Sequence, residues 1–96
     1  MKYEVLTLLR PENTEEQVDA TIEKIKKNIE DVSGTFIDAE KWGKREIPYA
    51  FKKHKGLKEA FYVLINFEKS QSDLTKLDYN IRIDDNVVRH MITKKG

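Results

Sequence analysis

Basic and aromatic side chains gather in one stretch of the sequence. Residues 41–58 hold seven lysines and arginines against one glutamate, although the formal net charge of the whole chain is only +1. The stretch also includes the only tryptophan, Trp42, and Tyr49. Cationic groups neutralise phosphates, and amphipathic rings anchor macromolecular partners. The stretch therefore predicts attachment to a polyanion, a protein or both, although lysines on a sheet edge can also serve only to prevent aggregation.

Groups suited to catalysis are sparse. The chain has no cysteine and two histidines, His54 and His90, and it contains neither a serine-nucleophile motif nor a phosphate-binding glycine loop. The acidic residues between Glu15 and Glu23 fall in a predicted helix, where a solvated face and the helix dipole explain them better than a metal site does. We expect a protein that is not an enzyme, with no cofactor, no metal and no small-molecule substrate.

Composition favours one small soluble domain spanning residues 1–96. Hydrophobic residues make up 39% of the chain and charged residues 36%, which is typical of a folded and highly charged protein. The apolar runs are too short to cross a membrane, and the N-terminus lacks the pattern of a signal peptide. The absence of cysteine fits a reducing compartment. We therefore expect a cytoplasmic protein without a membrane partner.

The first half of the chain predicts a strand, a helix and a second strand. Residues 2–9 are rich in β-branched, aromatic and leucine side chains and end before Pro11. Thr14 and Gln17 have the spacing of a capping box, and isoleucine and valine recur at helical intervals as far as Val32. We expect Gly34 to end this helix in the left-handed conformation. Strand character resumes over 35–39 and, beyond Gly43, over 44–49, where Pro48 indicates an edge or a bulge.

The second half predicts a strand, a short helix and a last strand. Phe61, Val63, Ile65 and Phe67 alternate with residues that are themselves largely apolar, so both faces of this strand are expected to be partly covered. Residues 70–73 offer a helix cap, and Leu74, Leu77 and Ile81 form one face of a helix ending near Asn80. The last strand is expected over 86–93.

The order β-α-β-β-α-β predicts an α+β, ferredoxin-like fold, a four-stranded antiparallel sheet with two helices on one face. The other face then has no helix, and its apolar side chains predict a second contact surface. The terminal strands lie near one another in this fold. We therefore expect Lys2, Tyr3, Arg89 and Lys94 to share an edge or face as a second basic site.

Several motifs resemble those of the bacterial ribosomal protein S6 family. The similar segments are the opening K-Y-E-V, E-K-W-G-K-R-E-I-P-Y at 40–49, A-F-Y-V-L-I-N-F-E at 60–68 and I-R-I-D-D-N-V-V-R-H-M at 81–91. The resemblance runs nearly end to end. The chain departs from the usual family pattern at Pro48, before the tyrosine, and at Asp84, where an extra basic residue is common.

The resemblance implies a structural protein of the small ribosomal subunit. It implies binding to the central domain of small-subunit ribosomal RNA together with ribosomal protein S18. Matching positions imply RNA contacts by Lys2, Tyr3, Arg82, Arg89 and Lys94. Within residues 41–49, we expect Lys41 and Arg45 to bind RNA and Trp42 and Tyr49 to bind the protein partner.

A different class of function also fits the predicted fold. A ligand-sensing or oligomerising ferredoxin-like module would use the uncovered face of the sheet to pair with another copy of itself. Tight self-association without affinity for RNA would favour that alternative.

Overall fold

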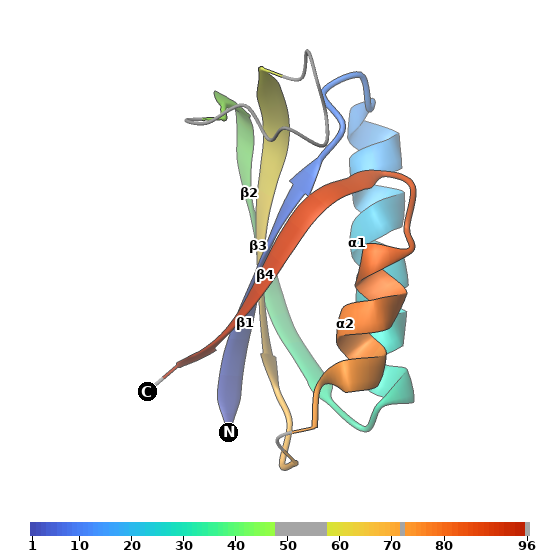
Figure 1. The fold of residues 1–96 in the computed structure, drawn as a ribbon, viewed down its shortest axis with the longest axis vertical. Coiled ribbons are helices and arrows are strands. Elements are labelled where there is room, and N and C mark those ends of the chain that lie inside the picture. The colour runs from blue at the N-terminus through green and yellow to red at the C-terminus, as the bar shows by residue number, and fades with distance from the viewer. Residues whose placement is uncertain (48–57, 72, 96) are drawn as a thin grey trace.

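The computed structural model describes residues 1–47, 58–71 and 73–95. Its secondary structure follows the order β-α-β-β-α-β (Figure 1). The elements are β1 (Lys2–Leu9), α1 (Glu15–Asp31), β2 (Thr35–Glu46), β3 (Glu59–Glu68), α2 (Thr75–Arg82) and β4 (Val87–Lys95).

The four strands form one antiparallel sheet in the order β2-β3-β1-β4. Both helices lie on the same side of this sheet, with α1 against β2 and α2 against β4 (Figure 1). The ferredoxin-like prediction is therefore confirmed. The opposite face of the sheet carries no helix among the described residues.

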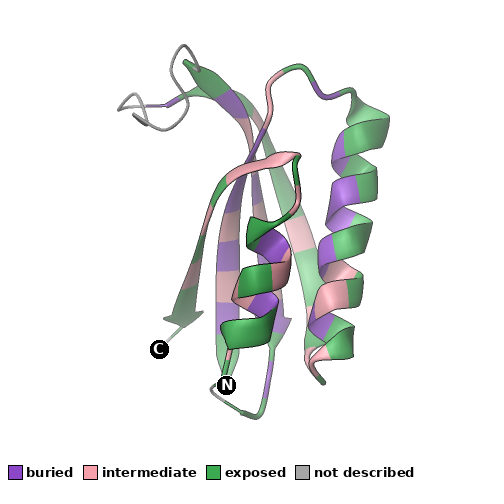
Figure 2. Ribbon diagram, turned by 45° about the vertical axis from the view of Figure 1, so that its right-hand side comes forward, coloured by how far each residue is buried: buried purple, intermediate pink, exposed green. Residues whose placement is uncertain are grey.

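Helix α1 begins and packs as its sequence predicts. The Thr14 hydroxyl accepts a hydrogen bond from the Gln17 backbone N–H at 3.2 Å, and the Gln17 side chain accepts one from the Thr14 N–H at 2.8 Å. This capping box satisfies two amides that have no partner within the helix. The buried positions of α1 form a stripe on the side toward the sheet (Figure 2). They include Val18, Ile25 and Ile29, which pack on the buried side chains of the sheet.

The end of α1 differs from the sequence-based prediction. Ser33, and not Gly34, adopts the left-handed conformation, with φ of 64°. Glycine is required at position 34 for a different reason. The Gly34 N–H donates to the Ile29 carbonyl at 2.8 Å, and a Cβ at this position would lie 2.8 Å from Ile29 Cγ2. The chain turns into β2 so closely against α1 that a side chain has no room.

Strand β2 begins at the predicted residue, but it is continuous where an interruption was predicted and ends earlier than predicted. It continues from Thr35 through Gly43 to Glu46, where the prediction had an interruption near Gly43 and an end at residue 49. Ile47 follows the strand, is buried, and donates its N–H to the Lys58 carbonyl at 2.8 Å. Pro48 and Tyr49 lie outside the described residues.

The bounds of α2 and β4 shift by one or two residues. Helix α2 reaches Arg82 instead of ending near Asn80, and β4 extends to Lys95. The N-cap residue of α2 is Leu74, which has no side-chain cap; Asp73, one residue earlier in the predicted cap stretch, accepts the Thr75 N–H at 3.0 Å. Among the described residues, no helix is both long and apolar enough to span a membrane.

Candidate nucleic-acid and partner interface

The helix-free side of the sheet, which we call the open face, is built from rows of paired residues. Strand pairing places Gly43, Tyr62, Leu8 and Arg89 in one row across β2, β3, β1 and β4. Residues two positions along each strand share the same face. The next row consists of Glu40, Leu64, Leu6 and Met91; then come Asp38, Asn66, Glu4 and Thr93; and the last holds Thr35, Glu68, Lys2 and Lys95.

An apolar patch lies on the first two rows of the open face and on residues just beyond the first row. Leu8, Ile47 and Ala60 are buried there and pack with partly buried neighbours, namely Leu6, Tyr62 and Val88. A shallow hollow of ≈ 190 Å³ opens beside them, lined by the side of β1 and β4 that includes Met91 and Arg89. Met91 leaves 54% of its surface exposed. An apolar patch bordered by cationic groups has the anatomy of a macromolecular contact.

Trp42 joins this patch because β2 bulges. The register between β2 and β3 shifts between Lys41 and Gly43, and Gly43 takes φ of 81°, which is unfavourable for other residues. The extra residue turns the Trp42 ring toward β3, where it stacks on Tyr62 with 6.4 Å between ring centroids. The Arg45 guanidinium lies 5.3 Å from the centre of the Trp42 ring. The bulge thus places an aromatic pair and a cation at the border of the apolar patch.

The basic residues of the open face occupy opposite ends of the sheet. Arg45 and Arg89 border the apolar patch, whereas Lys2 lies in the last row. Arg89 and Lys95, the partner of Lys2, are six positions apart along β4, which corresponds to about 20 Å. The row between them carries the carboxylates of Asp38 and Glu4. The structure therefore separates the two basic ends.

The expectation that Tyr3 shares a surface with Lys2 and Arg89 is wrong. Tyr3 points to the helix side, is only 3% exposed, and stacks on Phe67 with 5.4 Å between ring centroids. The alternation of side chains along β1 explains this placement, because neighbours on a strand face opposite sides. Lys94 is exposed but pairs with Tyr3 in the ladder, so it belongs to the helix side.

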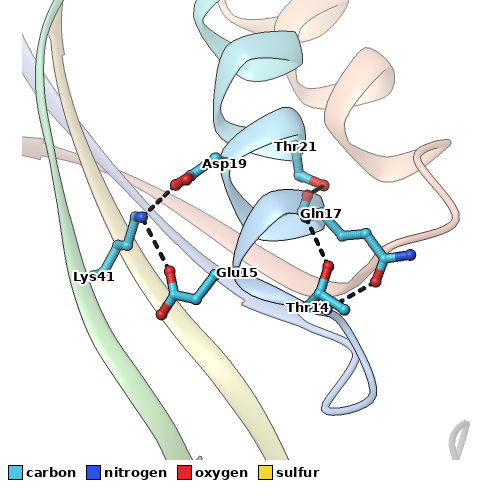
Figure 3. A network of polar contacts seen from close by, with 6 residues as sticks. All are labelled: Thr14, Glu15, Gln17, Asp19, Thr21 and Lys41. Carbon is cyan, nitrogen blue, oxygen red and sulfur yellow. Dashed lines mark hydrogen bonds and ion pairs between the residues drawn. The ribbon is translucent and has the colours of Figure 1, made fainter.

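Lys41 also faces the helix layer. Its ammonium group forms an ion pair with Asp19 and a second one with Glu15 at 3.3 Å, both on α1 (Figure 3). The hydrogen bond to Asp19, followed by the one to Glu15, raises the pKa of Lys41 above its ordinary value. Lys41 therefore links β2 to α1 and can reach a phosphate only by leaving these carboxylates.

Arg82 lies on α2, away from the open face. Its guanidinium donates to Asp78 at 2.9 Å, one helical turn earlier, and 66% of its side chain remains exposed. The other carboxylate oxygen of Asp78 lies 2.7 Å from His90 Nε2. This chain of contacts ties the end of α2 to β4. It leaves Arg82 as an exposed cation on the helix side of the molecule.

Sequence reasoning predicted a second contact surface but did not name its central residues. The central residues lie on three different strands, namely Tyr62, Leu8 and Met91. Only the strand pairing shows that they lie in neighbouring rows. The signal available in the sequence was the apolar character of both strand faces. Of the predicted site residues, the structure gathers Trp42, Arg45 and Arg89 around the patch, and Tyr49 lies outside the described residues.

Comparison with known proteins adds an independent line of evidence. The sequence profile of the family described as ribosomal protein S6 matches residues 2–94. A curated relative from Desulforamulus reducens, named small ribosomal subunit protein bS6, is 38% identical over 94 residues, which cover 98% of this chain and 96% of the relative. A protein of the same name from Clostridium beijerinckii is 40% identical, with 98% and 96% covered.

Solved structures agree with the sequence comparison. The crystal structure of 30S ribosomal protein S6 from Thermotoga maritima superposes with a TM-score of 0.84 and 27% identity, covering 98% of this chain and 86% of that one. The P2 domain of the chemotaxis kinase CheA from the same organism has a TM-score of 0.59 at 16% identity. That second likeness shows only that the fold is shared.

Proposed function

The chain belongs to the ribosomal protein S6 family, and we propose from this membership that it binds the central domain of small-subunit ribosomal RNA together with ribosomal protein S18. Its relatives are named as proteins of the small ribosomal subunit, which makes this chain a structural component of the ribosome, a cytoplasmic particle in bacteria. The family is not a class of enzymes.

Within the structure, the feature that best supports this proposal is the border of the apolar patch. Trp42, Arg45 and Arg89 stand around it on two different edges of the sheet. We assign the apolar patch, with Trp42, to the protein partner, because a partly exposed aromatic and apolar surface is best stabilised by another protein surface. Tyr49 remains a prediction for the same contact.

We assign the cationic side chains to RNA phosphates. Arg45 and Arg89 act next to the protein partner, Lys2 and Lys94 act at the far end of the sheet, and Arg82 acts from α2. Each cation that neutralises a phosphate releases condensed counterions, which provides affinity without reading a base. Tyr3 contributes by fixing β1 in the core, and Lys41 by joining β2 to α1.

The assignment of Arg89 predicts a change in the salt dependence of binding. Replacing Arg89→Ala removes one phosphate contact, so affinity for the central-domain RNA falls and the slope of log affinity against log salt becomes shallower by about one unit. Filter binding or fluorescence anisotropy across a salt series, with S18 present and absent, measures both quantities. We expect much tighter binding when S18 is present.

Lys24→Ala provides a matched control, because this residue is an exposed cation on α1. Its slope should equal that of the unchanged protein. An unchanged slope in the Arg89 variant would remove Arg89 from the RNA contacts. Tight self-association together with absent RNA binding would instead favour the oligomerising module, since the apolar patch also suits a second copy of the chain.

A further inference from the structure

Strand β4 forms one margin of the sheet. The strand order β2-β3-β1-β4 gives it a single neighbour, β1, among the described residues. In Figure 2, β4 runs along the free side of the sheet and its C-terminal part extends away from both helices. The outer side of an edge strand presents N–H and C=O groups that no ladder satisfies, and such a row can pair with another strand.

The outer part of β4 is regular. Its pairing with β1 proceeds without a break from Lys2 opposite Lys95 to Leu8 opposite Arg89, and the only register shift of this ladder follows Leu8. The other margin, β2, has two shifts, near Ile37 and near Trp42. Bulges disturb an edge and discourage further pairing. The residues 89–95 of β4 lack that protection.

Charge distinguishes the two margins as well. β4 contains Arg89, Lys94 and Lys95 and no acidic residue, whereas β2 contains three acidic and three basic residues. Lys95 is 48% exposed in its side chain and meets Glu4 only at 3.8 Å. Two copies of β4 side by side would bring like charges together, which is destabilising between neighbouring strands. An acidic strand would meet opposite charges instead.

We propose that the outer edge of β4 binds an extended acidic peptide segment as a fifth strand of the sheet. Backbone hydrogen bonds to residues 89–95 hold the segment, and alternate side chains supply selectivity. Carboxylates on one face of the added strand lie next to Arg89 and Lys95, and residues on its other face lie next to Ile92 and Lys94. This activity goes beyond the attachment to RNA and S18, because it uses the backbone of an edge.

A synthetic eight-residue peptide that alternates valine and glutamate tests the proposal. The measurement is amide hydrogen exchange of the full chain, followed by NMR during titration. We expect the added protection to be confined to amides of β4. The same peptide with alternate amides methylated keeps its charge but loses several hydrogen bonds, so its binding should weaken at least about tenfold.

Variants of the protein distinguish binding at the edge of β4 from nonspecific attraction between the acidic peptide and cationic side chains. Changing both Lys94→Gln and Lys95→Gln removes two exposed charges at the edge and should weaken peptide binding about threefold or more. The control removes two exposed charges from α1, by Lys24→Gln and Lys27→Gln, and should leave binding unchanged.

Three results would overturn the proposal. They are equal binding by the methylated peptide, protection that falls outside β4, and protection of β4 that rises with protein concentration in the absence of peptide. The last result would assign the edge to a second copy of the chain. Because these readouts contain no RNA, their failure is distinguishable from a failure of the proposed ribosomal function.

Discussion

The backbone conformation of the neighbouring residue, Gly43, places the Trp42 side chain on the open face. Gly43 adopts φ of 81° at the bulge, and its missing Cβ would meet no atom within 4 Å. Space is therefore not the reason for glycine at this position. Only the backbone conformation requires it, because other residues pay a steric penalty in the left-handed region. The orientation of the Trp42 ring on Tyr62 depends on this one residue.

A substitution at Gly43 should separate strain from crowding. Gly43→Ala is expected to lower the free energy of unfolding by about 1 kcal/mol, because alanine is strained at positive φ. Gly43→Asn should lose less, since asparagine tolerates this conformation better. Urea denaturation measures the loss. Near-UV circular dichroism follows the stack of Trp42, the only tryptophan, on Tyr62. Equal losses for alanine and asparagine would show that backbone strain is not the cause.

Helix α2 depends on a carboxylate placed just before it. Asp73 accepts the Thr75 N–H, and this backbone hydrogen bond, followed by one from the Thr75 side chain, lowers the pKa of Asp73 below its ordinary value. A lowered pKa in the folded protein means that the carboxylate stabilises the fold above the pKa of the unfolded chain. This contribution disappears as the pH falls through the folded pKa.

The stability of the Asp73→Ala variant should therefore depend on pH. It should be lower than that of the unchanged protein at pH 7, and the difference should shrink once the pH falls below about 4, where an ordinary aspartate gains its proton. Denaturation by urea at several pH values provides the comparison. The control is Asp31→Ala, which removes a carboxylate from the C-terminal end of α1. A negative charge there is unfavourable for the helix dipole, so this change should not destabilise the protein. A difference that stays constant into acid would contradict the role of the carboxylate.

The sequence predicted each helix and strand that the structure describes, because local patterns indicate them. Thr14 with Gln17 marks the start of α1, and alternation at Phe61 to Phe67 marks β3. Sequence alone could not predict the outcome of strand pairing. The burial of Tyr3 and the ion pairs of Lys41 depend on which face of a strand meets the helices. A bulge also changes which residues of a strand face which side of the sheet. The position of Trp42 could therefore be known only once the register of β2 against β3 was known.

The whole molecule has an uneven charge that its net charge conceals. Residues 1–40 contain ten acidic and five basic residues, and many of the carboxylates lie on α1. The open face places Arg45 and Arg89 on the other side of the sheet. Such an arrangement can orient a protein near a polyanion. On the function proposed above, we expect the open face to form the main contact in the ribosome, with Arg82 and Lys94 reaching RNA from the helix side.

The most direct test of this account compares two exposed apolar residues on opposite sides of the molecule. Met91 is 54% exposed on the open face, and Ile83 is 58% exposed at the end of α2. Each is replaced by aspartate, and circular dichroism verifies the fold. Incorporation into reconstituted small subunits is then measured by co-sedimentation with S18 and ribosomal RNA. We expect Met91→Asp to weaken incorporation at least about tenfold, because a charge is placed in the proposed protein contact, and Ile83→Asp, which lies beside Arg82, to weaken it clearly less. Normal incorporation of the Met91 variant, or a greater loss in the Ile83 variant, would contradict this expectation.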